Sequence, residues 1–279
     1  MGRLTRSEAA AHREALGLAG LRRDLDEDEK RFVLTHFKES AGQARPVEGT
    51  FFTPTGLADC MSLDVIGNRV IDLCAGIGAL AFACRNPHEQ GRGLPAREIV
   101  CVEADPEFVA VGMKLVPEAT WVCADVFEVG RQRWRLFDTA IANPPFGNRP
   151  RTGNAPGYRG HRFEYHVIAL ASHLARHGVF LVPQTSAPFI YSGCHEIREE
   201  QGDAEYKRFS SGTGIALEPG CSVDTAFYDP CWHQRPVRTE IVTTEFADTV
   251  LARRRRDRHQ TRAGAGAPAS PWERPARAS

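Results

Sequence analysis

Short apolar segments alternate with helix-like segments through the middle of this chain. Five apolar segments, at residues 68–73, 98–103, 120–125, 137–142 and 179–183, have the length and composition of strands. Three of the segments between them, at residues 79–85, 105–116 and 162–178, have the apolar spacing of helices, and the last of these ends on a glycine. Strands that alternate with helices indicate a mostly parallel sheet with helices on both faces. We therefore predict a doubly wound α/β domain.

The two ends of the chain differ from this middle part. Residues 221–229 and 236–246 alternate apolar and polar side chains without a helix between them, which predicts an antiparallel terminal hairpin with its loop at 230–235. The sheet would then have seven strands. Residues 5–40 read as two helices. We predict a helical extension at 1–48, the main domain at 49–250 and a basic, disordered tail at 251–279.

Charge is balanced overall but unevenly placed. The sequence has 35 Lys and Arg residues and 35 Asp and Glu residues. Between Arg253 and Ser279 there are eight arginines and only two acids, Asp257 and Glu273. Such a tail suits weak, salt-sensitive binding of nucleic acid, or serves only to keep the protein in solution.

Neither the cysteines nor the N-terminus points outside the cytoplasm. The eight cysteines are scattered, at positions 60, 74, 84, 101, 123, 194, 221 and 231. The first residues lack the apolar stretch of a secretion signal, and no window has the length of a membrane span. We expect reduced cysteines, a cytoplasmic protein and no membrane partner.

A glycine turn follows the first predicted strand, in the stretch "VIDLCAGIGAL". Gly76 and Gly78 would let the backbone approach a ligand closely, at a helix start with free N–H groups. Such turns also serve tight packing of a strand against a helix. Three acids favour the ligand: Asp72 precedes the turn, Glu103 ends the second strand and Asp125 ends the third. Strand-end acids in an open α/β sheet line the ligand crevice.

This order of residues resembles the class I S-adenosylmethionine-dependent methyltransferases. The resemblance implies that Gly76 and Gly78 cradle S-adenosylmethionine, with Cys74 in the same turn. It also implies that Glu103 binds the ribose hydroxyls of the cofactor and that Asp125 lies near its adenine amine. Asp72 is expected to orient the methionine part, directly or through water.

The fourth strand ends in Asn143-Pro144-Pro145-Phe146, a motif that the amino-methylating members of this family carry at this place. An aromatic amine is a poor nucleophile, because its lone pair is delocalised into the ring. The Asn143 side-chain oxygen and the Pro144 carbonyl can each accept one amine hydrogen, which frees the lone pair to attack the methyl group. Phe146 can stack on the base, a contact worth roughly 1–3 kcal/mol. A stiff turn that merely ends the strand is the structural alternative.

The stretch "FFTPTGLA" lies upstream of the glycine turn. It resembles an element of the N6-adenine DNA methyltransferases of gamma-type motif order, which implies that Phe52, Thr53 and Pro54 contact the methionine end of the cofactor. The same residues also suit a helix start capped by Thr53, with Pro54 in its first turn.

The loop after the Asn-Pro-Pro-Phe motif is rich in arginine. Arg149, Arg151, Tyr158, Arg159 and Arg162 lie in it, and they suit either contacts to phosphate groups or a solvated loop. A nucleophilic role for Cys231, which follows Pro230, conflicts with the Asn-Pro-Pro-Phe motif after the fourth strand. A zinc site at Cys221, Cys231 and His233, with Cys194 and His195 as further donors, lacks a Cys-x-x-Cys pair, so we predict no metal.

We predict a methyltransferase that modifies an exocyclic amine, most simply adenine N6 in DNA. Methylation of an RNA base amine or of a protein glutamine amide is the alternative, because Asn-Pro-Pro-aromatic motifs serve those reactions too. Gamma-type DNA enzymes usually carry a separate recognition domain, and none is evident in this sequence. We therefore expect a nonspecific enzyme, recognition by a partner subunit, or action on RNA. A cofactor-binding module without catalysis is a different class, and the complete set of motifs argues against it.

Overall fold

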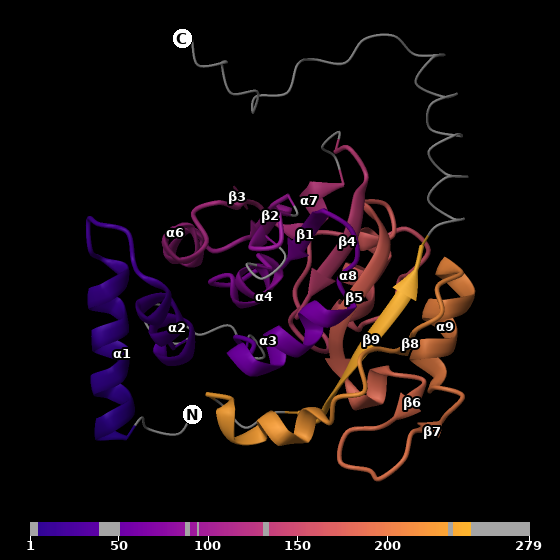
Figure 1. The fold of residues 1–279 in the computed structure, drawn as a ribbon. Helices are drawn as coiled ribbons and strands as arrows, with labels where there is room; N and C mark the ends of the chain where they lie inside the picture. Colours follow the sequence, from indigo (N-terminus) through magenta and orange to yellow (C-terminus); the bar gives the residue numbers. More distant parts are fainter. Residues whose placement is uncertain are drawn as a thin grey trace, which may run out of the picture.

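The computed structural model describes residues 5–38, 51–86, 90–93, 95–130, 134–233 and 237–246. Its centre is a seven-stranded sheet in the order β3-β2-β1-β4-β5-β9-β8 (Figure 1). Five strands are parallel: β1 (Arg69–Leu73), β2 (Glu98–Glu103), β3 (Thr120–Cys123), β4 (Phe137–Ala142) and β5 (Ala175–Pro183). β9 (Thr239–Glu245) runs antiparallel to both of its neighbours, β5 and β8 (Glu218–Pro219). The predicted doubly wound, seven-stranded α/β fold is confirmed.

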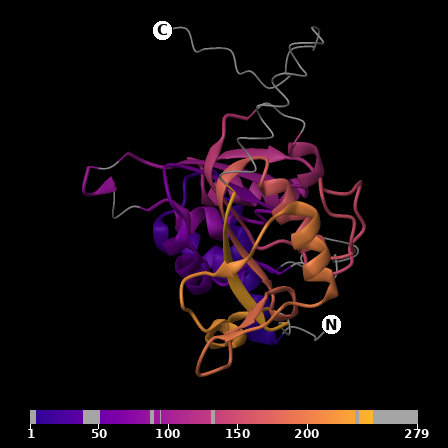
Figure 2. The same cartoon turned by 90° about the vertical axis from the view of Figure 1, so that its right-hand side faces the viewer.

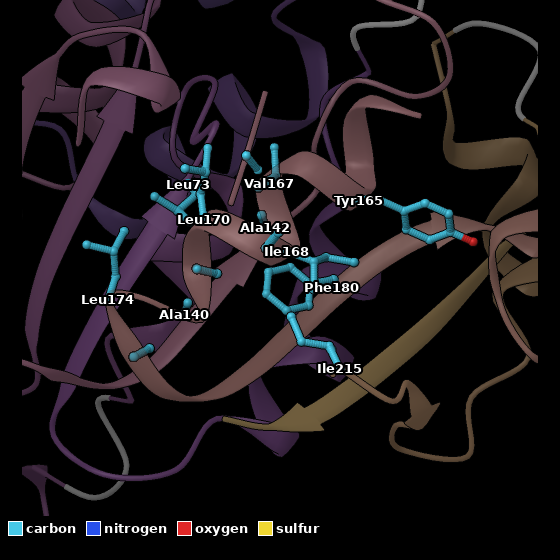
Figure 3. Close-up of a cluster of buried hydrophobic side chains, with 14 of the residues drawn as sticks. Leu73, Ala140, Ala142, Tyr165, Val167, Ile168, Leu170, Leu174, Phe180 and Ile215 are labelled. Atoms are coloured by element: carbon cyan, nitrogen blue, oxygen red, sulfur yellow. The ribbon is translucent and has the colours of Figure 1, made fainter. Parts of the chain in front are cut away.

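Successive residues of the central strands enter two separate cores, because side chains alternate between the faces of a strand. Ile71 and Leu73 of β1 belong to one apolar cluster, while Val70 belongs to the other. Figure 3 shows part of the first cluster, in which Leu73 and Phe180 of the strands pack with side chains of α8. Both faces of the sheet are therefore buried.

Helices cover both faces. One face carries α3 (Thr55–Met61), α4 (Ala79–Cys84) and α6 (Pro106–Leu115), and the other carries α7 (Val126–Val129), α8 (Phe163–Ala171) and α9 (Ala204–Thr213). Three short 3-10 helices are η1 (Ser62–Asp64), η2 (Gln184–Ser186) and η3 (Thr225–Cys231), and β6 (Phe189–Ile190) pairs with β7 (Arg198–Glu199). Both views place α9 on the β9 side of the molecule, away from the N-terminal helices, whereas η3 lies beside α3 (Figures 1 and 2).

The two predicted N-terminal helices are present as α1 (Arg6–Ala19) and α2 (Glu27–His36). Each begins with a capping box, in which Thr5 pairs with Glu8 and Asp26 with Glu29. Arg85, at the end of α4, binds Glu27 of α2 with a shortest N–O distance of 2.6 Å. The helical pair is thus attached to the α4 side of the sheet.

The predicted helix at 162–178 is too long. α8 ends at Ala171, and β5 already begins at Ala175. Gly178 ends no helix; it pairs with Ala140 of β4 and Thr244 of β9. Hydrogen-bond ladders on both sides of β5 outweigh the helical pattern of this segment. α8 is also not amphipathic, since all nine of its residues are buried.

The predicted hairpin partner of β9 is wrong. The segment 221–229 does not form a strand; Thr225–Cys231 is the 3-10 helix η3, and the strand beside β9 is β8, further upstream. Asp224 caps η3 by accepting a hydrogen bond from the Ala226 N–H at 2.9 Å. The Thr225 hydroxyl then donates to the Thr239 carbonyl at 2.7 Å, which ties the helix to the start of β9.

Three other sequence-based predictions concern the chain as a whole. All eight cysteines are free thiols. Within the described ranges, no helix has the length and apolar character needed to cross a membrane. The basic tail lies outside the described residues, as do residues 39–50 between the N-terminal helices and the main domain.

Candidate active site

The glycine turn connects β1 to α4 in a backbone conformation that favours glycine. Gly76 has a φ of 56° and Gly78 a φ of 92°. A Cβ atom on Gly76 would lie 3.0 Å from the Phe52 ring, and one on Gly78 would lie 3.1 Å from the Trp121 ring. Gly76 lines the large cavity beside the sheet, whereas Gly78 does not. Gly76 therefore shapes the cavity, and Gly78 allows close packing behind it.

Glu103 ends β2 and faces the same cavity. Its Oε2 accepts the Gly76 N–H at 2.8 Å, and its Oε1 accepts the Asp105 N–H at 2.9 Å. Burial raises the pKa of Glu103 above its ordinary value, while these backbone donors act against that rise. Each carboxylate oxygen still has acceptor capacity, so Glu103 can bind two neighbouring hydroxyl groups such as those of a ribose.

Asp72 lies beneath the glycine turn and outside the cavity lining. Its side chain is fully buried, and its Oδ2 accepts the Ala81 N–H of α4 at 3.1 Å. Its Oδ1 has no hydrogen-bond partner among the described residues. Burial, with a smaller contribution from Glu103, raises the pKa of Asp72 well above its ordinary value. The structure thus places Asp72 as a support of α4 rather than at the cavity surface.

Asp125 follows β3 and lines the cavity. It caps α7, with its Oδ1 accepting the Phe127 N–H at 2.9 Å. Its Oδ2 accepts a hydrogen bond from the Thr152 hydroxyl at 3.3 Å. Asp125 therefore connects the third strand end to the loop that follows the Asn-Pro-Pro-Phe motif.

Asn143 is half-buried at the end of β4 and lines the cavity. Its Nδ2 donates to the Phe51 carbonyl at 2.9 Å and to the Thr53 hydroxyl oxygen at 3.0 Å. The Phe51 carbonyl can only accept, so the nitrogen of the amide must face it. Both hydrogens of the amide are then used within the protein, each bond contributing about 0.5–1.5 kcal/mol. The Asn143 Oδ1 is left to accept from a ligand, with no donor to it among the described residues.

A buried acid, Glu164, fixes the turn that follows Asn143. Gly147, with a φ of 77°, donates its N–H to Glu164 Oε2 at 2.9 Å, and its carbonyl accepts the Phe163 N–H at 2.8 Å. Glu164 is 1% exposed and also accepts from the Ser186 hydroxyl at 2.7 Å. Pro144 is buried and Pro145 lines the cavity. The motif is therefore a fixed platform.

Aromatic rings extend from the motif. The half-buried Phe146 ring lies 6.3 Å from the Phe51 ring, which in turn meets Trp232 edge-on at 6.1 Å. Phe51 lines the cavity beside Asn143, while Phe146 lies outside the lining. Phe52, on the other side, packs edge-on against Phe108 at 5.0 Å. Pro54 is buried, does not line the cavity and is itself the N-cap of α3, so the predicted helix cap by Thr53 is wrong.

The cavity has a volume of about 580 Å³ and is mainly apolar in lining. This size lies within the range of about 300–1,000 Å³ that is usual for small-molecule sites. Its lining includes the acidic residues Glu103, Asp105 and Asp125 and the glycine turn. Apolar walls with an acid at each of two strand ends fit a nucleoside with a short side chain, such as S-adenosylmethionine.

Cys74 also lines the cavity, in a left-handed conformation with a φ of 63°. Burial and the nearby carboxylates, Glu103 first, raise the pKa of its thiol well above the ordinary value. The thiol is therefore neutral and unreactive at neutral pH.

The arginine-rich loop is more tightly held than a solvated loop. Tyr158 is 1% exposed and donates to Glu205 at 2.7 Å, so its ring is not available for a nucleic acid. Arg162 pairs with Asp203, and Arg151 donates to the Gly160 carbonyl at 3.0 Å. Arg159 is exposed.

Arg149 differs from these arginines. It lines the cavity, and its Nε donates to the Phe146 carbonyl at 3.1 Å. No carboxylate pairs with its guanidinium in the part of the chain that is described. Among the residues that the structure describes, no acid pairs with Arg149 or Arg159, so both guanidinium groups can meet a phosphate group.

The cysteine and histidine side chains weighed as metal ligands do not converge. Across the described ranges, no three His, Cys, Asp or Glu side chains are placed to hold a metal ion. The His233 ring is hydrogen bonded to the Thr35 carbonyl of α2 at 2.8 Å, and Cys221 Sγ donates to the Cys60 carbonyl at 3.2 Å. Cys231 is exposed at the end of η3 and does not line the cavity.

Sequence reasoning missed three residues of the site. The contact of Asn143 with Phe51 uses a backbone carbonyl, which no residue type reveals, and the two residues are 92 positions apart in the sequence. Glu164 reads as a surface acid on a helix, although it is buried under the motif. Phe108 reads as an ordinary helix residue. Of these, only Glu164 had a signal in the sequence: Gly147 indicates a tight turn, and its N–H donates to Glu164.

Known proteins share this fold. A chain of Listeria monocytogenes described as a class I S-adenosylmethionine-dependent methyltransferase superposes with a TM-score of 0.55 at 14% identity, over 88% of this chain and 82% of that one. A type I restriction-modification methyltransferase subunit of Streptococcus thermophilus gives a TM-score of 0.50 at 14% identity, over 80% of this chain and 51% of that one. The protein has the class I methyltransferase fold. The fold and the shape of the cavity imply S-adenosylmethionine as its cofactor.

One curated relative is similar in sequence. The rRNA N(6)-adenosine-methyltransferase Mettl5 of Drosophila melanogaster is 30% identical over an alignment of 148 residues that covers 48% of this chain. The matched region spans 62% of that relative's length. No protein-family model matches the chain.

Proposed function

We propose that this protein is an S-adenosylmethionine-dependent methyltransferase that modifies an exocyclic amine, with adenine N6 of a nucleic acid as its target. One observation carries the proposal. The Asn143 amide has both hydrogens engaged by Phe51 and Thr53, so its oxygen is left at the edge of the cavity as an acceptor. An acceptor fixed in this way suits an N–H group of a substrate.

The residues that would hold the cofactor lie where three strands end, β1, β2 and β3. All three residues line the cavity: Gly76 would let the nucleoside part approach the backbone, Glu103 would bind the ribose hydroxyls, and Asp125 would lie at the adenine end. The cofactor supplies a methyl group activated on a sulfonium. Phe52 and Phe108 close the cavity on the α6 side and exclude water.

The Asn-Pro-Pro-Phe platform acts on the amine. Asn143 Oδ1 and the Pro144 carbonyl each accept one amine hydrogen, so the nitrogen lone pair is directed at the methyl carbon instead of the ring. With the cofactor bound, its sulfonium would give up the methyl group to the amine nitrogen, and the surplus proton would pass from that nitrogen to water. Phe146 supports the base by stacking. Positioning and electrostatics account for catalysis, with no covalent intermediate.

The "FFTP" element favours adenine N6 in DNA as the target, by its resemblance to the N6-adenine DNA methyltransferases of gamma-type motif order. Adenosine in ribosomal RNA is the second candidate, and the similarity to Mettl5 supports it. Arg149 supports a nucleic acid over a protein glutamine, because its guanidinium lies beside the motif and pairs with no acid in the described ranges. A base within a duplex has to be flipped out to reach Asn143.

Pools of DNA, RNA and protein incubated with methyl-labelled S-adenosylmethionine test this function. We expect label in adenine of one nucleic acid, at N6. Label in the DNA pool alone supports the first candidate and label in the RNA pool alone the second. Label in protein glutamine would contradict the nucleic-acid target, and label on a carbon or ring nitrogen would contradict amine chemistry altogether.

A further inference from the structure

The "FFTP" element belongs to the amine side of the site as well as to the cofactor side. We propose that Thr53 is a positioning residue for Asn143: its hydroxyl oxygen, together with the Phe51 carbonyl, fixes the Asn143 amide so that Oδ1 faces the substrate amine. This inference rests on the proposed function, since it concerns how the acceptor for that amine is oriented.

The contacts leave the Asn143 amide one favourable orientation. Its Nδ2 lies 2.9 Å from the Phe51 carbonyl oxygen and 3.0 Å from Thr53 Oγ1. If the amide were rotated by half a turn, Oδ1 would face the Phe51 carbonyl, and two acceptor oxygens would meet. The rotated amide would also turn its N–H groups towards the substrate amine, so that two hydrogen-bond donors would face each other.

Thr53 is built to hold this geometry. Its side chain is 5% exposed, at the start of α3, and its χ1 angle is restricted by branching at Cβ. The neighbouring Phe52 and Pro54 are buried, and Phe52 packs against Phe37 and Phe108. The hydroxyl oxygen therefore has little freedom to move away from Asn143.

A cofactor contact and a positioning role predict different losses. If Thr53 served only to bind the methionine part, its removal would weaken S-adenosylmethionine binding and leave the chemical step intact. If Thr53 orients Asn143, its removal leaves cofactor binding intact and slows the methyl transfer, because a misoriented acceptor affects the transition state.

Thr53→Val and Thr53→Ser separate the two roles in the full-length protein. Valine keeps the shape of threonine without the hydroxyl, and serine keeps the hydroxyl. For Thr53→Val we expect kcat to fall about tenfold or more, with the Kd for S-adenosylmethionine within about threefold of wild type. For Thr53→Ser we expect kcat within about threefold of wild type. Cofactor binding by calorimetry also shows that each variant is folded.

A spectroscopic readout is independent of turnover. In spectra of protein labelled with ¹⁵N, the two side-chain N–H signals of Asn143 should be protected from exchange in wild type and in Thr53→Ser. One of them should lose that protection in Thr53→Val. Unchanged kcat and unchanged Asn143 signals in Thr53→Val would overturn the positioning role, as would a loss confined to cofactor affinity. If wild-type protein methylates no amine, the proposed function fails instead.

Discussion

Gly76 donates its backbone N–H to Glu103 Oε2 at 2.8 Å, and this bond joins the ends of the first two strands. The second oxygen of Glu103 accepts from Asp105. The carboxylate is therefore held by backbone on both oxygens while it faces the cavity. This arrangement fixes where a pair of cofactor hydroxyls can bind.

Glu103→Gln should weaken S-adenosylmethionine binding about tenfold or more, since an amide NH₂ would face one of the two backbone N–H donors. Titration calorimetry measures the Kd directly. Glu107→Gln is the matched control, because Glu107 is an exposed acid at the start of α6. An equal Kd for wild type and Glu103→Gln would remove Glu103 from the cofactor site.

Asn143→Asp should lower methyl transfer about tenfold or more, although aspartate is found in related motifs. In this chain the replaced atom faces the Phe51 carbonyl, and a carboxylate oxygen would be repelled there. The Kd for the cofactor should stay within about threefold of wild type. Single-turnover assays measure the transfer, with Asn148→Asp as the control at an exposed asparagine. Full activity of Asn143→Asp would show that the Phe51 contact does not select the amide.

Asp72→Asn should change how stability depends on pH. Burial holds the pKa of Asp72 well above 3.8 in the folded state. Above pH 3.8 the folded state therefore binds more protons than the unfolded state. The free energy of unfolding is highest below pH 3.8 and falls as the pH rises towards the pKa of Asp72 in the folded state. The asparagine side chain does not ionise, so Asp72→Asn lacks this pH-dependent loss of stability.

Urea unfolding of wild type and Asp72→Asn between about pH 5 and about pH 8 measures the effect. We expect the free energy of unfolding of the variant, relative to wild type, to rise with pH. Asp28→Asn, at an exposed position on α2, should show no such trend. If the free energy of unfolding of Asp72→Asn relative to wild type stays constant or falls with pH, the prediction is contradicted, and another group compensates the charge of the buried carboxylate.

Gly76→Ala should lower the free energy of unfolding by about 1–2 kcal/mol, because a left-handed residue with a Cβ is strained. The added methyl group would also press on the Phe52 ring, which lies 3.0 Å from the Cβ position, and so reduce cofactor affinity. Gly153→Ala is the control, since its Cβ would meet no atom within 4 Å. Equal stability of the two variants would contradict the reading of the turn.

Local sequence patterns predicted the parts of the fold that depend on neighbouring residues. The strand ends at Glu103 and Asn143 follow from apolar runs that stop at a polar residue. Other features depend on distant partners. The segment 225–231 became η3 because Thr225 bonds to Thr239, and β5 began at Ala175 because β4 and β9 flank it. The contact between Thr53 and Asn143 joins residues 90 positions apart, which no local pattern encodes.

The position of the transferred methyl group tests the central claim most directly. Wild-type protein should be incubated with labelled S-adenosylmethionine and an adenine-containing DNA or RNA, and the nucleosides then separated by mass spectrometry. We predict that the label is on the exocyclic nitrogen of adenine and that it is lost in Asn143→Ala, whose cofactor binding is retained. Label on a carbon or ring nitrogen, or equal transfer by Asn143→Ala, would contradict this account.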